Sequence, residues 1–131
     1  MDILTLFISV VAAVVAQSLH LLWYSTATGM GKAWRTALKK KADAKIPTKM
    51  SIISFTSLVV SSLIYGFFVS SLGMSAGIDF VIFTVLMFIA FTIPSKVMSV
   101  IFMGQPRRLI LIDGGFYLIA YALFGLAHYL F

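Results

Sequence analysis

The stretch SLHLLWYSTATGMGKAWRTALKKK, residues 18–41, decides the fold because its preference for solvent changes abruptly along its length. It begins inside a long apolar run, passes through Trp23 and Tyr24, and becomes strongly basic after Gly31. Trp and Tyr gather where a membrane-spanning helix leaves the hydrocarbon, and Lys and Arg gather in the connections on the cytoplasmic side. The stretch therefore predicts a helix that leaves a membrane near Tyr24 and continues into a basic segment beside it.

The composition of the whole chain supports a membrane protein. Of its 131 residues, 61% are hydrophobic and 11% are charged, whereas a soluble domain carries about 25% charged residues. The chain has no cysteine, which excludes a disulfide framework, a thiolate nucleophile and a Cys-based metal site. Its length suits a single integral membrane domain over residues 1–131.

Four apolar segments are long enough to cross a bilayer, which takes about 20 mainly apolar residues in a helix. We predict an all-α, four-transmembrane-helix bundle with helices over residues 3–25, 50–72, 79–103 and 109–131. The first segment is expected to be a retained helix, because its apolar run is too long for a signal peptide and Asp2 stands where such peptides are basic. Pro94 predicts a kink or an end in the third helix, and Pro106 separates the third from the fourth.

The basic residues predict the orientation of these helices. All ten Lys and Arg residues lie in the connection between the first two helices or at the junction of the last two. Because cytoplasmic connections are enriched in Lys and Arg, we expect both termini to be non-cytoplasmic. We expect a multi-pass protein of a bacterial inner (plasma) membrane.

Residues 29–41 predict an amphipathic helix in the cytoplasmic interface. Apolar side chains recur at helical spacing from Met30 to Leu38, and basic side chains occupy the other face. Each cation near an anionic leaflet contributes about 1 kcal/mol of attraction, so we expect contacts with anionic lipid head groups. Recognition of a specific lipid or partner protein is the alternative, and nucleic acid is not expected as a partner. The expected interfacial residues are Trp23, Tyr24, Lys32, Trp34, Arg35, Lys39, Lys40, Lys41, Arg107 and Arg108.

Four polar residues fall within the predicted membrane segments: Gln17, His20, Lys96 and Asp113. At 1.5 Å of rise per residue, all four lie in the cytoplasmic half. A Lys96–Asp113 ion pair would offset the cost of placing either charge in a low dielectric, and Gln17 with His20 would extend it into a hydrogen-bonded network. In the alternative, Lys96 extends to the head groups and Asp113 binds the first-turn amides of its own helix.

The polar residues give little support for catalysis. The sequence has no paired carboxylates, no HExxH motif and no spacing that suggests a Ser-His-Asp triad. His20 and His128 lie at opposite ends of the predicted helices, so a shared metal site is not expected. The sequence leaves open whether the chain is an enzyme, although it favours a non-enzymatic protein, and no cofactor is expected.

The segment LLWYSTATGMGKAW, residues 21–34, resembles the signature of a bacterial family known as domain of unknown function 1761. The resemblance rests on Trp23, Tyr24, Ser25, then on Gly31, Lys32 and Trp34, and spans nearly the whole chain. It implies a small four-helix membrane protein without an established reaction, and it assigns no catalytic residue.

Two functional classes remain open from the sequence. The first is a small solute or ion transporter, or a channel-like homo-oligomer, that uses the Gln17, His20, Lys96 and Asp113 cluster. The second is a non-enzymatic accessory or scaffold subunit of a larger membrane complex, or a lipid-interacting protein, that uses its helix faces and residues 29–41. Flux through liposomes that depends on Asp113 would indicate the first class, and co-purification with a partner membrane protein would indicate the second.

Overall fold

The computed structural model describes residues 1–131, which form helices and short connections without any strand. The helices are α1 (Ile3–Trp23), α2 (Gly29–Ala37), α3 (Thr48–Leu72), α4 (Gly77–Met87), the π-helix η1 (Phe88–Thr92), α5 (Ile93–Met103) and α6 (Arg108–Leu130). The predicted all-α class is confirmed. Four spans are long and apolar enough to cross a membrane, as in a multi-pass membrane protein: Ile3–Trp23, Thr48–Leu72, Gly77–Met103 and Arg108–Leu130.

Local side chains and glycines set the ends of the helices. The Asp2 carboxylate accepts a hydrogen bond from the Thr5 amide at 2.8 Å, which caps the start of α1. Gly73 and Gly104 end α3 and α5 in the left-handed conformation, with φ of 61° and 64°. Each predicted span differs from its helix by a few residues, and α1 ends at Trp23 rather than at residue 25.

The third span passes Pro94 without ending. It runs from Gly77 to Met103, and its π-helical turn, Phe88–Thr92, lies directly before the turn that contains Pro94. A proline removes one backbone donor and clashes with the carbonyl four residues earlier, here that of Ala90. The wider π turn accommodates this clash, so the proline reshapes the helix instead of stopping it.

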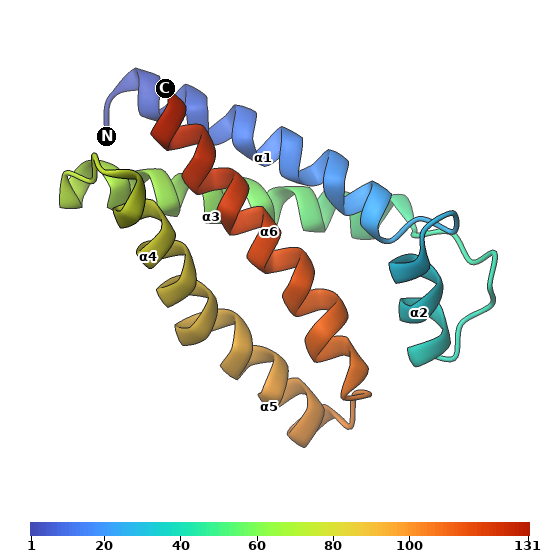
Figure 1. The fold of residues 1–131 in the computed structure, drawn as a ribbon. Helices are drawn as coiled ribbons and strands as arrows, with labels where there is room; N and C mark the ends of the chain where they lie inside the picture. Colours follow the sequence, from blue (N-terminus) through green and yellow to red (C-terminus); the bar gives the residue numbers. More distant parts are fainter.

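Helix α6 lies at the centre of the packing. It contacts α1, α2, α3, α4 and α5. Figure 1 shows it between the pair α1 and α3 and the continuous span formed by α4, η1 and α5. Its side chains Phe116, Ala120 and Phe124 are among the most buried in the chain. The core joins them to side chains of the surrounding helices, including Ala12, Ala16, Leu58, Tyr65 and Phe80.

The outward faces of the long helices are apolar. Large hydrophobic side chains there are strongly exposed, for example Phe7, Phe67, Phe91 and Leu111. A soluble monomer rarely leaves so much contiguous apolar surface in water, whereas helices that face lipid require it. The exposed apolar side chains therefore support the four helical segments as membrane spans.

The two ends of the fold differ in chemistry. Figure 1 shows the N- and C-termini close together, near the connection from α3 to α4. We call this the terminal end. The other end, which we call the basic end, holds α2, the 38–47 connection and the turn from α5 to α6. It carries the ten Lys and Arg residues, nine of them in these segments or within a few residues of them and Lys96 on α5.

Candidate functional site

A pocket with a volume of about 370 Å³ lies at the basic end. Its walls come from the last turn of α1, the start of α3, α5 and α6, and from α2 with the 38–47 connection. The volume falls in the range of small-molecule sites, roughly 300–1,000 Å³. The lining residues are His20, Tyr24, Trp34, Lys40, Ala44, Lys45, Ile46, Pro47, Met50, Ser54, Lys96, Asp113, Phe116 and Tyr117.

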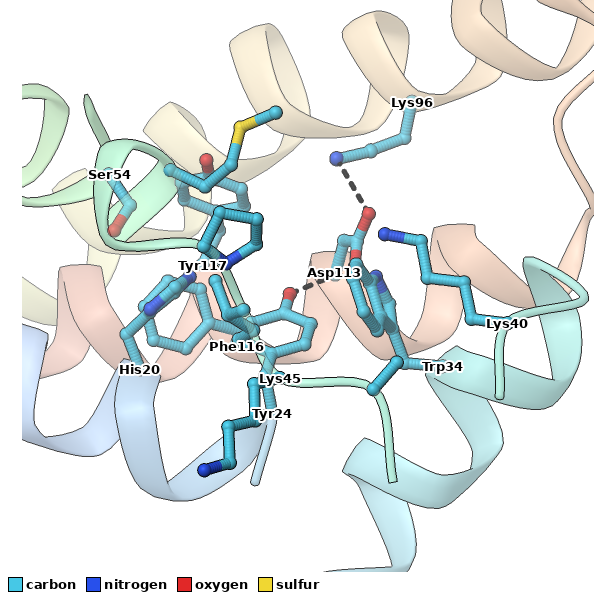
Figure 2. Close-up of a pocket in the computed structure, with 14 residues that line it drawn as sticks. His20, Tyr24, Trp34, Lys40, Lys45, Ser54, Lys96, Asp113, Phe116 and Tyr117 are labelled. Atoms are coloured by element: carbon cyan, nitrogen blue, oxygen red, sulfur yellow. Dashed lines mark hydrogen bonds and ion pairs between the residues drawn. The ribbon is translucent and has the colours of Figure 1, made fainter. Parts of the chain in front are cut away.

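Asp113 is the polar centre of this pocket. Its Oδ2 receives a hydrogen bond from Lys96 Nζ at 2.9 Å, and its Oδ1 receives one from the Tyr24 hydroxyl at 2.8 Å (Figure 2). The predicted Lys96–Asp113 ion pair is confirmed, with side chains only 21% and 12% exposed. Because charges withdrawn from water are costly unless paired and hydrogen-bonded, this pair and Tyr24 form one coupled unit.

Tyr24 does not have the interfacial position that the sequence suggested. It follows directly after α1 and is 6% exposed, turned inward onto Asp113. Burial raises the pKa of the Tyr24 phenol, and the adjacent Asp113 carboxylate raises it further, so the hydroxyl keeps its proton and acts as a donor. The spacing of Gln17, His20 and Tyr24 could have indicated this, because residues i, i+3 and i+7 share one face of a helix.

Gln17 and His20 do not extend the hydrogen bonds of the ion pair. The Ser54 hydroxyl donates to Gln17 Oε1 at 3.2 Å, and Gln17 Nε2 makes a longer contact to the Ser51 carbonyl, so Gln17 joins α1 to α3. His20 lines the pocket, where its ring packs against Tyr24 and Phe116 with centroids 4.8 and 5.1 Å away. Its Nδ1 is buried and has no hydrogen-bond partner.

The position of Arg35 differs from the prediction, which put it on the basic face of residues 29–41 that meets lipid head groups. Its side chain is 3% exposed, so it does not reach lipid head groups. Its Nε donates to the Ala44 carbonyl, and its Nη1 donates to the carbonyls of Tyr24 and Gly31, each at 2.9 Å. Arg35 thus joins the end of α1, the start of α2 and the 38–47 connection, which together form one wall of the pocket.

Trp34 and Lys40 form the part of this wall that faces Asp113. Lys40 Nζ lies 4.5 Å from the centre of the Trp34 ring, a cation–π distance, and the Trp34 ring packs edge-on against Tyr24 at 5.5 Å. In Figure 2 the Lys40 and Lys96 side chains extend toward the Asp113 carboxylate, whereas Lys45 points away from it. The sequence placed Trp34 and Lys40 at the lipid interface and did not connect them with Asp113.

The remaining predicted interfacial residues lie outside the pocket. Trp23 is half-buried and its Nε1 donates to the Ile112 carbonyl at 3.1 Å, so it packs onto α6. The side chains of Lys32, Lys39, Lys41, Arg107 and Arg108 are exposed. Contacts of these five residues with lipid head groups remain a prediction.

A second polar cluster lies toward the terminal end, and the sequence did not indicate it. The Ser9 hydroxyl lies 3.2 Å from His128 Nε2, and the Tyr65 hydroxyl lies 3.0 Å from Thr84 Oγ1. The His128 ring is half-buried and stacks on Tyr65. Ser9, Tyr65 and the neighbouring Phe124 are almost fully buried, so this cluster is packed inside the protein.

Comparison with known proteins identifies one family. The model of the family described as Protein of unknown function (DUF1761) matches residues 8–129. No curated protein and no solved structure matches the chain.

Proposed function

The chain belongs to the family Protein of unknown function (DUF1761), and we propose from its geometry that it is a small proton-linked solute carrier of a membrane. One observation carries this proposal. The Lys96–Asp113 pair, with the Tyr24 hydroxyl, lies in a pocket at one end of four apolar helices. Ionisable residues at membrane depth are rare, costly and commonly part of ion or solute pathways.

The pocket is one-sided, as the binding site of a carrier is in one of its two states. At the basic end its lining includes the exposed residues Lys40, Lys45 and Met50, which give a ligand access. Toward the terminal end the side chains of Phe124 and Tyr65 are buried in the core. In this proposal the present conformation admits a solute from the basic end only.

Asp113 is the proposed switch between the two states of the carrier. As a carboxylate it accepts hydrogen bonds from Lys96 on α5 and from Tyr24 at the end of α1, so it ties the two sides of the pocket to α6. Protonation removes the charge that Lys96 requires and weakens both bonds, since charge-assisted hydrogen bonds are the stronger kind. The pair α1 and α3 and the span formed by α4, η1 and α5 then gain freedom to move relative to α6.

The concentration of Lys and Arg at one end supports the orientation of the carrier. Cytoplasmic connections carry the excess of basic residues, so the pocket opens to the cytoplasm and both termini lie on the other side. We propose that this membrane is the inner membrane of a bacterium.

We expect Asp113→Asn to abolish proton movement, because the amide keeps the shape of the carboxylate and loses its charge. Protein reconstituted into liposomes with a trapped pH-sensitive dye, under a potassium gradient with valinomycin, reports proton flux. Wild type is expected to exceed protein-free vesicles, and Asp113→Asn to fall to their level while remaining folded.

Asp43→Asn is the matched control, since Asp43 is exposed in the 38–47 connection and its carboxylate makes no ion pair. It is expected to behave as wild type. Flux in Asp113→Asn equal to that of wild type, or wild-type flux no greater than that of empty vesicles, contradicts the proposal.

A further inference from the structure

We infer that the pocket binds an organic anion, with one carboxylate or phosphate group on an apolar or aromatic body. This inference deepens the proposed function, because it names the ligand class of the same pocket. It concerns binding rather than transport, so the two are tested by different measurements.

The charges of the pocket favour an anion. Three lysines line it, Lys40, Lys45 and Lys96, against the single carboxylate of Asp113. Lys96 is paired with Asp113, and this is the one ion pair of the chain, so Lys40 and Lys45 have no carboxylate partner. An acidic ligand would supply the missing negative charge.

The Arg35 guanidinium adds to the positive charge of the pocket from behind the wall that α2 and the 38–47 connection form. Its guanidinium is buried, and its hydrogen bonds go to the backbone carbonyls of Tyr24, Gly31 and Ala44. Those carbonyls accept from three of its five N–H donors without neutralising its charge. Two of the carbonyls belong to pocket-lining residues, Tyr24 and Ala44, and a buried charge acts over a longer range than one screened by water.

The other lining side chains suit an apolar or aromatic body. Trp34 and Phe116 offer rings, and Ile46, Pro47 and Met50 offer aliphatic surface. Sites for small molecules combine such apolar walls with a few polar groups that fix orientation. A small inorganic anion would leave this surface without a partner.

His20 provides a polar group that the protein itself does not use. Its Nδ1 is buried without a hydrogen-bond partner, although buried polar atoms nearly always have one. The ring lines the pocket and is held against Tyr24 and Phe116. A bound ligand with a polar atom beside His20 would satisfy this nitrogen.

The ligand described by these groups has two sources. It is either the head group of an anionic lipid, with its chains along the helices, or an organic anion from solution. Both present an acidic group and an apolar body to the same residues, so the experiment has one arm for each source.

The first arm measures soluble ligands through Trp34 fluorescence. The chain has two tryptophans, so Trp23→Phe leaves Trp34, which lines the pocket, as the only reporter. In nanodiscs of phosphatidylcholine, phenyl phosphate is expected to change this fluorescence saturably. Benzyltrimethylammonium, an aromatic cation of similar size, is expected to cause no saturable change.

The second arm measures lipid. The same single-tryptophan protein is placed in nanodiscs that contain brominated phosphatidylglycerol or brominated phosphatidylcholine. Stronger quenching of Trp34 by the anionic lipid assigns the site to a lipid head group. A saturable response to phenyl phosphate without this preference assigns it to a soluble anion, and either result supports the inference.

Substitution of two lysines tests the charge directly while leaving the Lys96–Asp113 pair in place. We expect Lys40→Gln with Lys45→Gln to weaken the anion response about tenfold, since each pairing with an exposed lysine is weak and two of them are removed together. The matched control, Lys39→Gln with Lys41→Gln, removes two exposed charges outside the pocket and is expected to change the response to phenyl phosphate little. The inference is overturned if phenyl phosphate and benzyltrimethylammonium give equal responses, or if neither arm gives a selective response. It is also overturned if the two double variants lose the response equally.

Discussion

Gly31→Ala is expected to lower the free energy of unfolding by about 3 kcal/mol or more, at the upper end of the cost of overpacking. A Cβ at this position would overlap the Ser25 carbonyl oxygen and lie 2.8 Å from the carbonyl carbons of Ser25 and Tyr24. These are backbone atoms, which cannot turn aside as the end of a flexible side chain can. The methyl group would therefore push α2 away from the end of α1.

The position of Gly31 is also fixed by hydrogen bonds on both sides. Its amide donates to Thr28 Oγ1 at 3.0 Å, and its carbonyl accepts from Arg35 Nη1 at 2.9 Å. A displaced α2 breaks the contact between Arg35 and Tyr24 and leaves a buried cation short of acceptors. The loss of stability should therefore be accompanied by loss of the pocket wall.

Gly29→Ala is the control, two residues earlier in the same Gly-Met-Gly sequence. A Cβ there meets nothing within 4 Å, so its stability should stay within about 0.5 kcal/mol of wild type, as for most surface changes. Unfolding in mixed micelles, followed by circular dichroism, measures both variants. Equal stabilities of Gly31→Ala and Gly29→Ala would show that Gly31 does not approach the Tyr24–Ser25 backbone as described.

Asp113→Leu is expected to cost about 3 kcal/mol, the low end of the range for removing one partner of a buried ion pair. The change leaves Lys96 without its counterion and the Tyr24 hydroxyl without its acceptor. The low end applies because the Lys96 side chain is 21% exposed and retains some contact with water.

The double variant Lys96→Met with Asp113→Leu separates the cost of the unpaired charge from the value of the pair. Replacing a whole buried pair with apolar residues is often neutral, so the double variant should recover most of the stability lost in Asp113→Leu. The same unfolding measurement in micelles compares the single variants and the double variant. A double variant as unstable as the sum of its single variants would mean that Lys96 and Asp113 act independently.

The helices and the ion pair could be predicted from the sequence because they depend on local or simple properties. Apolar runs of sufficient length give the four spans, and two opposite charges at membrane depth gave the Lys96–Asp113 pair. The effect of Pro94 on the third helix was harder to predict. Whether a proline stops or reshapes a helix depends on whether the turn before it can widen. Here the widened turn spans Phe88–Thr92.

The walls of the pocket could not be predicted because they depend on the direction in which α2 leaves α1. A helical pattern places Trp34 and Arg35 on different faces of α2, but it does not say which face meets protein. The close approach at Gly31 turns α2 back onto the end of α1, which buries Arg35 and brings Trp34 and Lys40 to Asp113. The Ser9–His128 contact was missed for a similar reason, since 119 positions separate the two residues.

The central claim is that the chain crosses a membrane four times, with the basic pocket on one side and both chain ends on the other. Because the chain has no native cysteine, single cysteines can report this through a membrane-impermeant maleimide. Ala42→Cys lies in the exposed 38–47 connection, and Ser75→Cys lies in the exposed turn between α3 and α4. In intact spheroplasts we predict labelling at Ser75→Cys and none at Ala42→Cys, with the reverse in inside-out vesicles. Labelling of both positions from the same side would contradict the account.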